Sequence, residues 1–244
     1  MKNYAFVGLG PLAMSMLERI AQITDRIVVI DRDSQVIDRV KDMVKTAYVA
    51  DFLDEGALQK ILPEAIDVAV VDISTDIEAE ILVTHWLQKI GVKEIIVKSS
   101  SDERSEILKI VGATRVVNSD REAAARIVPL VLSSALYNFM PIGGDLVMAE
   151  VRVPEEVVGN SLVEADLRRR HGINVVAVRS EASTNYRDFD RDYKLKANDF
   201  LLVAAKESDI FKFSGIPNVP QQGVDKKGKF AGIAAFLRNI EKKR

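Results

Sequence analysis

The sequence predicts an α/β protein: a Rossmann-type, doubly wound parallel sheet followed by a second, smaller α+β lobe. Three observations lead to this prediction. Short β-branched runs alternate with helical patterns over residues 4–118, and a glycine-rich turn joins the first run to the first helix. From Leu146 onward the strands instead alternate apolar and polar residues. Nearly continuous apolar runs, as in the first part, are typical of parallel strands, because helices cover both of their faces.

Six strands are expected in the first part, in the runs YAFVGLG, RIVVIDRD, TAYVADF, VAVVDIS, EIIVKSS and RVVNS. The helices between them should begin near Leu12, Asp33, Asp54, Asp76 and Asp102. At several of these positions an acidic or hydroxyl residue can cap the helix or complement its dipole. Residues 1–120 therefore form a complete Rossmann-type unit.

A single helix is expected over residues 121–145, with Pro129 inside it and a stop at Gly143-Gly144. Apolar residues occur on nearly every side between Ile127 and Phe139, so we expect this helix to be buried all round. We interpret it as a crossover helix that packs between subunits and is kinked near Pro129. The alternative is an ordinary last helix on one face of the sheet.

The second lobe should span residues 146–214. The run LVMAEVRV predicts a strand, SLVEADLRRRHG a helix and INVVAVRS another strand. DYKLKANDFLLVAAK predicts two short strands about a Lys-Ala-Asn-Asp turn, followed by a short helix at 207–213. Residues 215–244 read as a linker that ends in an amphipathic stretch, FAGIAAFLRNI.

Composition excludes several classes of function. The 34 lysines and arginines against 36 aspartates and glutamates give a net charge of −2. The chain therefore lacks the excess positive charge that is typical of proteins that bind nucleic acid or an anionic membrane. The absence of cysteine excludes disulfides, thiolate catalysis and cysteine metal sites. No apolar run approaches the roughly 20 residues that span a bilayer, and the chain enters an apolar strand without a signal sequence. We expect a soluble, cytoplasmic protein.

The turn Gly8-Leu9-Gly10-Pro11-Leu12-Ala13 is the frame in which a pyrophosphate lies on a helix N-terminus. Asp31 ends the second strand, 23 residues after Gly8, where a carboxylate can accept from both ribose hydroxyls. Its charge would repel a 2′-phosphate, so an unphosphorylated adenosine ribose is favoured. Pro11 suits a first helical turn but removes one backbone donor. The alternative is a tight turn without a ligand.

Further polar residues end neighbouring strands at the same edge. Asp51 closes the third strand, Asp72-Ile73-Ser74 the fourth, and Lys98, which could neutralise phosphate, the fifth. Doubly wound sheets bind ligands at this carboxyl edge. Each residue alone could equally be a solvated strand end, but together they outline a cleft.

Catalytic and metal-binding patterns are weak. The only histidines, His85 and His171, have no partner at a catalytic spacing and are interpreted as structural. A nicotinamide-dependent oxidoreductase needs an acid–base group beside the cofactor, and its absence favours sensing over catalysis. Two local patterns that could bind ions also have simple structural explanations. The basic run 168–171 could bind an anion or simply complement a helix C-terminus. Asp188, Asp190, Asp192 and Asp199 mimic a calcium loop, but Tyr193 replaces its glycine, so a solvated hairpin loop is favoured.

The order and spacing of these stretches resemble the RCK proteins (regulators of conductance of potassium), specifically the soluble Ktr/Trk-type subunits of bacterial potassium-uptake systems. The resemblance covers residues 3–214. It includes FVGLGPLAMSML, VVIDRD, YVADFLDEGAL and KIVGATRVVNSDREAA in the first lobe. In the second lobe it includes EVRVPEEVVGNSLVEADLRRRHGINVVAVRS and DYKLKANDFLLVAAK.

The resemblance implies a nucleotide-gated regulator and no enzyme: dimers that assemble into a ring, expected to be an octamer, beneath a membrane potassium channel or transporter. It implies a cytoplasmic location at the inner face of the membrane, held there by the pore partner. Adenine nucleotide, ATP, ADP or NAD(H), would bind the first lobe, with a divalent cation as a candidate companion. The nucleotide contacts implied by position are Gly8, Leu9, Gly10, Pro11, Leu12, Asp31, Arg32, Asp51, Phe52, Asp72, Ile73, Ser74 and Lys98.

Two more sites follow from the resemblance alone. Asp120 resembles an acidic residue that some members place near phosphate or a cation at the dimer interface. Some members bind cyclic di-AMP between subunits in the second lobe, and Arg168 and Asn174 lie at positions that resemble contacts there. The family often has Arg where this chain has Pro11, which weakens the expected discrimination of ATP from ADP.

Overall fold

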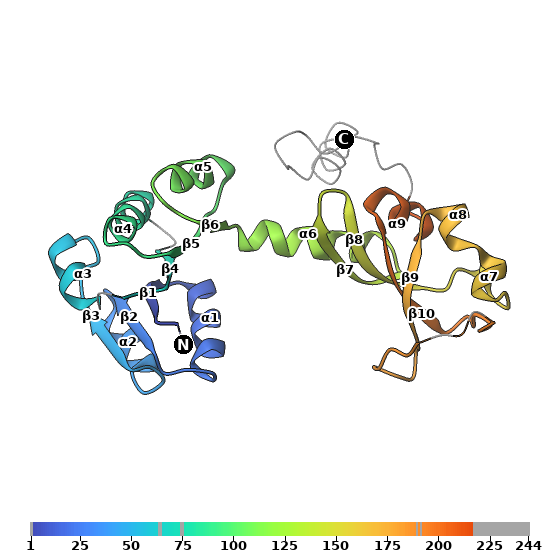
Figure 1. Cartoon of the computed structure of the whole chain (residues 1–244), viewed down its shortest axis with the longest axis horizontal. Coiled ribbons are helices and arrows are strands. Elements are labelled where there is room, and N and C mark those ends of the chain that lie inside the picture. Colours follow the sequence, from blue (N-terminus) through green and yellow to red (C-terminus); the bar gives the residue numbers. More distant parts are fainter. Residues whose placement is uncertain (1, 63–64, 74–75, 189, 191, 217–244) are drawn as a thin grey trace. The chain divides into compact units, whose positions relative to one another are not determined.

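The computed structural model of the chain describes residues 2–62, 65–73, 76–188, 190 and 192–216. It divides into two compact units, Met1–Arg121 and Glu122–Arg244 (Figure 1). The first carries a parallel sheet with helices, and the second an antiparallel sheet, which confirms the predicted fold class.

The first unit contains a six-stranded parallel sheet of order β3-β2-β1-β4-β5-β6. The chain order therefore reverses between β1 and β4, which makes the carboxyl end of β1 the switch point where doubly wound sheets bind ligands. The strands are β1 Tyr4–Leu9, β2 Ile27–Asp31, β3 Thr46–Val49, β4 Val68–Asp72, β5 Glu94–Lys98 and β6 Arg115–Val117.

Five helices connect these strands, and their starts confirm the expected positions. They are α1 Pro11–Ala21, α2 Ser34–Val40, α3 Glu55–Ile61, α4 Ile77–Lys89 and α5 Asp102–Ile110. The carboxylates of Asp33, Asp54 and Asp76 accept hydrogen bonds from amides in the first turns of α2, α3 and α4. Capping satisfies amides that have no partner within the helix. In α1 no side chain of the preceding Gly10 can do this.

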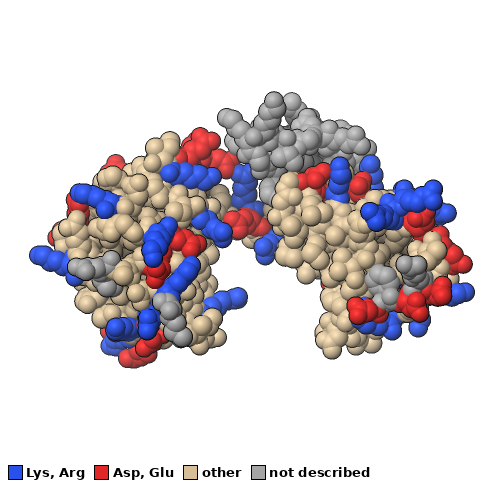
Figure 2. Space-filling view, viewed as in Figure 1, with Lys and Arg blue, Asp and Glu red and all other residues tan. Residues whose placement is uncertain are grey.

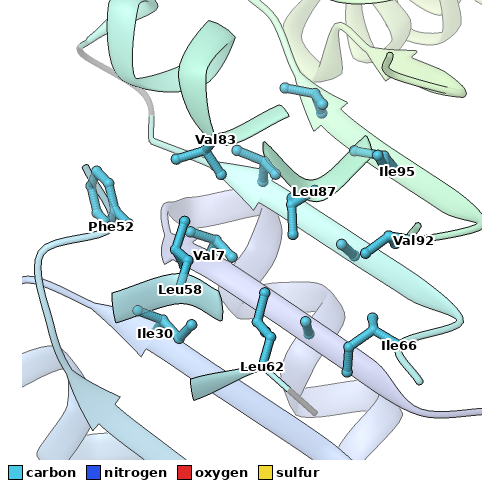
Figure 3. Close-up of a cluster of buried hydrophobic side chains, with 14 of the residues drawn as sticks. Val7, Ile30, Phe52, Leu58, Leu62, Ile66, Val83, Leu87, Val92 and Ile95 are labelled. Atoms are coloured by element: carbon cyan, nitrogen blue, oxygen red, sulfur yellow. The ribbon is translucent and has the colours of Figure 1, made fainter. Parts of the chain in front are cut away.

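Apolar side chains fill both faces of the parallel sheet. On one face the strand residues Val7, Ile30 and Ile95 belong to one cluster with Leu58 of α3 and Leu87 of α4 (Figure 3). The other face carries a second cluster, formed by Phe6, Leu17, Ile27, Val29, Ile37 and neighbours. Adjacent residues of one strand thus point to opposite faces, and helices cover both.

The predicted helix 121–145 is wrong in its second half. Helix α6, Ser119–Leu132, ends before strand β7, Leu136–Gly143, begins. Pro141 lies within the expected helix and would cost about 3 kcal/mol in a helix interior, whereas an edge strand accepts it; β7 is an edge of its sheet. The expected burial all round is also not found in the single chain, since Ile127 and Val131 are 55% and 79% exposed.

The second unit holds a four-stranded antiparallel sheet of order β7-β8-β10-β9. Its further strands are β8 Leu146–Arg152, β9 Asn174–Ser180 and β10 Asp199–Lys206. The helices are the 3₁₀ turn Glu155–Val157, α7 Leu162–Ala165, α8 Leu167–His171 and α9 Glu207–Phe213. The buried side chains of Leu136, Phe139, Val151, Leu201 and Phe211 belong to its core.

Two local predictions for the second unit need correction. The helix expected over residues 161–172 is split at Asp166, whose φ of 42° is left-handed. The first strand of the expected hairpin is reduced to one bridge between Lys194 and Ser161. The amphipathic stretch predicted near the C-terminus lies outside the described residues.

Candidate functional site

The carboxyl edge of the parallel sheet brings together the turn after β1, Asp31 at the end of β2, Asp72 at the end of β4 and Lys98 at the end of β5. Leu9, Gly10, Pro11 and Leu12 form the passage from β1 into α1. Ser74 of the predicted site lies outside the described residues.

Both glycines of the turn are required by close packing against the end of β4. Gly8 has a φ of +75°, and a Cβ there would lie 2.8 Å from the Asp72 carbonyl oxygen and from Ile73. A Cβ on Gly10 would lie 2.3 Å from the carboxylate of Asp72. A side chain at either position would therefore push β4 away from the turn.

Asp31 is fixed against the same turn. Its Oδ2 accepts from the amide of Leu9 at 2.7 Å, and its Oδ1 accepts from the amide of Asp33 at 2.9 Å. A carboxylate has about four acceptor positions, so both oxygens keep acceptor capacity for hydroxyl donors. This is the geometry expected of a carboxylate that positions a ribose beside a glycine-rich turn.

Asp72 occupies the N-terminus of α1. Its Oδ2 accepts from the amides of Leu12 at 3.0 Å and Ala13 at 3.2 Å, and its carbonyl oxygen accepts from the amide of Gly10 at 3.1 Å. Its side chain is fully buried. The carboxylate thus provides, from 60 residues away, the cap that Gly10 cannot supply.

Lys98 lies next to this carboxylate, and Glu80 is within reach of its charge. The Lys98 Nζ is 3.8 Å from Asp72 Oδ1, and its side chain is 20% exposed. Glu80 of α4 is 3% exposed, and no described group hydrogen-bonds its Oε2. Burial raises the pKa of Glu80 to about 7; nearby Arg104 and Lys98 lower this pKa, and Asp72 and Asp76 raise it.

Sequence reasoning missed Glu80, although a signal was present. Its position shares the buried stripe of α4 with Val83, Thr84 and Leu87, at helical spacing. A glutamate on the stripe that faces the sheet deserved separate notice, because a buried carboxylate is rare without a partner.

The residues after β3 have structural contacts of their own. The Oδ1 of Asp51 accepts from the amide of Leu53 at 3.0 Å. Phe52 is 3% exposed within the core, and the guanidinium carbon of Arg32 lies 4.4 Å from its ring centroid. This cation–π pair ties the end of β2 to the end of β3.

The remaining candidates do not join this cluster. Asp120 is exposed in the first turn of α6, beside the hydroxyl of Ser119. In the second unit, Arg168 is exposed on α8, and the Asn174 side chain donates to the Ala204 carbonyl at 3.2 Å. Within the part of the chain that is described, Arg168 and Asn174 make no hydrogen bond with each other.

The histidines and the acidic loop have structural surroundings. His85 is exposed on α4, and the ring of His171 packs edge-on against Phe213 at 5.3 Å. Asp199 is buried and accepts from the hydroxyl of Tyr193 and the amide of Lys196. Among the described residues, no group of three or more His, Asp or Glu side chains is arranged to hold a metal ion.

Two features of the described residues concern nucleic-acid binding and membrane insertion: the distribution of surface charge and the length of the helices. Figure 2 shows basic and acidic side chains interspersed over the visible face of each unit. Within the described residues, no helix combines the length and apolarity needed to cross a bilayer.

A hollow of about 550 Å³ lies at the amino edge of β1, β2 and β3, lined by Tyr4, Arg26, Lys45 and others. It is at the edge opposite Asp72 and contributes nothing to the cluster.

Comparison with protein families gives two matches. Residues 4–119 match the family model of the TrkA-N domain, and residues 148–215 match that of the TrkA-C domain. The Ktr system potassium uptake protein C of Bacillus subtilis is 26% identical over 87% of this chain and 96% of its own length. The Ktr system potassium uptake protein A of Vibrio alginolyticus is 23% identical over 86% of this chain and 94% of its own.

Solved structures show the same fold. The GsuK channel has a TM-score of 0.63 at 18% identity, over 98% of this chain and 44% of that chain. The GsuK RCK domain has a TM-score of 0.61 at 18% identity, over 97% of this chain and 53% of that one. The chain therefore spans about half the length of these structures. A further structure, the GsuK channel bound to NAD, has a TM-score of 0.62 at 17% identity.

Proposed function

Since this chain belongs to the RCK family of potassium-transport regulators, we propose that it is the nucleotide-sensing regulatory subunit of a potassium-uptake system. A nucleotide bound at the carboxyl edge of the parallel sheet changes the conformation of the chain and its assembly, and this change gates a membrane potassium channel or transporter. The match covers both the TrkA-N and TrkA-C domains, which separates this function from that of a lone Rossmann module.

The observation that carries the proposal is the position of Asp31. Its carboxylate is held at the turn after β1 by the Leu9 amide and retains acceptor capacity for ribose hydroxyls. The negative charge favours ATP, ADP or NAD(H) over ligands with a 2′-phosphate. NAD bound by the GsuK channel makes NAD(H) one of the ligands to test. A divalent cation with the phosphates, near Asp120, remains part of the proposal.

The chain acts without catalysing a reaction. The alternative, an NAD-dependent oxidoreductase, needs an acid–base group beside the nicotinamide. His85 is exposed on α4, and the ring of His171 packs on Phe213 in the second unit, so both have structural surroundings. A regulator needs only different affinities for its ligand in two conformations.

Assembly follows from the exposed apolar side chains of α6. Ile127, Val131 and Leu132 are 55%, 79% and 40% exposed in the single chain. Such residues on one short helix are typical of a surface that another subunit covers. We propose a homodimer that assembles into a ring, held at the inner face of the membrane by its pore partner. Cyclic di-AMP is the candidate second ligand, at Arg168 and Asn174.

Titration calorimetry with ATP, ADP and NADH tests the nucleotide proposal. Asp31→Asn removes the charge but keeps the size, and should weaken binding by about 1–2 kcal/mol. Asp38→Asn is the matched control, because Asp38 is exposed on α2 and forms a surface ion pair with Lys41 at 2.9 Å. Equal affinities of wild type and Asp31→Asn would refute the ribose placement.

A further inference from the structure

The amides that would hold a nucleotide phosphate at the turn are already engaged. The Leu9 amide donates to Asp31, the Gly10 amide donates to the Asp72 carbonyl, and Pro11 has no amide hydrogen. The next two amides, of Leu12 and Ala13, both donate to the Asp72 carboxylate. The anion at the N-terminus of α1 is thus part of the chain itself.

A cation at the same edge of the sheet is engaged by the same carboxylate. Lys98, which the sequence suggested as a phosphate ligand, lies 3.8 Å from Asp72 Oδ1. The Asp72 side chain is fully buried, so bulk water screens its charge poorly. A phosphate at this helix N-terminus would have to take two amides from Asp72 and would meet its negative charge at short range.

We propose that Asp72 is an internal competitor for the nucleotide phosphates and sets which part of the ligand supplies binding energy. This inference rests on the proposed nucleotide site. Adenosine and ribose contacts, through Asp31, carry the affinity of the wild-type chain. Phosphates bind at α1 only when the Asp72 carboxylate leaves, so Asp72 lowers affinity for phosphorylated ligands relative to adenosine.

The tight packing at Gly10 indicates a specific fit between the turn and the Asp72 carboxylate. A Cβ there would meet all three carboxylate atoms of Asp72 at 2.3 to 2.4 Å, so the turn is shaped around this carboxylate. A carboxylate and a phosphate have the same relation to a helix dipole and to free amides. Replacing the carboxylate by a phosphate therefore exchanges one set of hydrogen bonds to the amides for a similar set. The repulsion between the Asp72 carboxylate and the phosphate then determines whether the phosphate binds.

The test compares adenosine with ADP by calorimetry on the full chain. In Asp72→Asn the amide oxygen can still accept from Leu12 and Ala13, but the charge is gone. ADP should then bind about tenfold more tightly than to wild type, while adenosine affinity stays within about twofold. Asp67→Asn is the control, because Asp67 pairs with Lys93 at 3.0 Å just before the opposite end of β4.

Folding is checked independently by the melting temperature of each variant. If Asp72→Asn unfolds, Asp72→Ser, which keeps a small acceptor, provides the second variant. Weaker or unchanged ADP binding in a folded Asp72 variant, with adenosine still bound, would overturn this inference and leave the proposed function intact. Failure of every adenine compound to bind both wild type and the Asp72 variants would overturn both.

Discussion

Glutamine at position 80 should change how the stability of the first unit depends on pH. Glu80 is 3% exposed, and burial raises its pKa from an ordinary 4.5 to about 7. The folded unit therefore keeps a proton that the unfolded chain releases between these two values. The contribution of Glu80 to the free energy of unfolding is therefore greatest below pH 4.5. It falls as the pH rises towards 7 and stays low above that value.

The size of the effect follows from the two pKa values. A difference between 4.5 and about 7 corresponds to about 3 kcal/mol of unfolding free energy, lost fully above pH 7. Glu80→Gln removes this loss, because the amide is neutral at every pH. We expect the variant to match wild type near pH 4.5 and to be about 3 kcal/mol more stable at pH 8.

The single tryptophan makes the assay specific. Trp86 lies on the same helix as Glu80, packed against the core of the first unit, so its fluorescence in urea titrations reports on that unit. Glu78→Gln is the control, since Glu78 is exposed in the same helical turn. Parallel stability curves for wild type and Glu80→Gln from pH 4.5 to 8 would refute the reasoning.

Five further substitutions test the packing. Gly10→Ala should cost about 1–3 kcal/mol of stability by displacing Asp72, whereas Gly143→Ala, with open space around its Cβ, should cost little; chemical denaturation compares them. Leu136→Glu should unfold the second unit, while Val131→Glu should leave folding intact and lower the mass in sedimentation. Asp166→Gly should raise the melting temperature slightly by relieving a left-handed residue; no rise would contradict this.

Local signals predicted the first unit well. Each aspartate that precedes α2, α3 and α4 proved to be a helix cap, because capping depends on residues only two or three positions apart. The strand order could also be anticipated, since apolar runs between helices leave few topologies. The same reasoning placed the turn, Asp31, Asp72 and Lys98 at one edge of the sheet.

Local sequence signals failed to predict the structure where contacts between residues far apart in the chain determine it. Residues 127–139 are apolar without a clear period, and the strand pairing of β7 with β8 converts Leu136–Gly143 into sheet. The bond from Asp72 to α1 joins residues about 60 positions apart, so no spacing rule reveals it. A carboxylate expected to line the cleft instead fills the helix N-terminus, and this could be known only from the fold.

Potassium flux tests the central claim most directly. Vesicles that contain the partner membrane subunit are measured with wild-type chain or with Asp31→Asn, in the presence and absence of ATP, ADP and NADH. Our account predicts a flux that changes with nucleotide when the wild-type chain is bound, and a response shifted to higher nucleotide concentration for Asp31→Asn. Flux that is indifferent to every adenine nucleotide, while the chain stays bound to its partner, would contradict it.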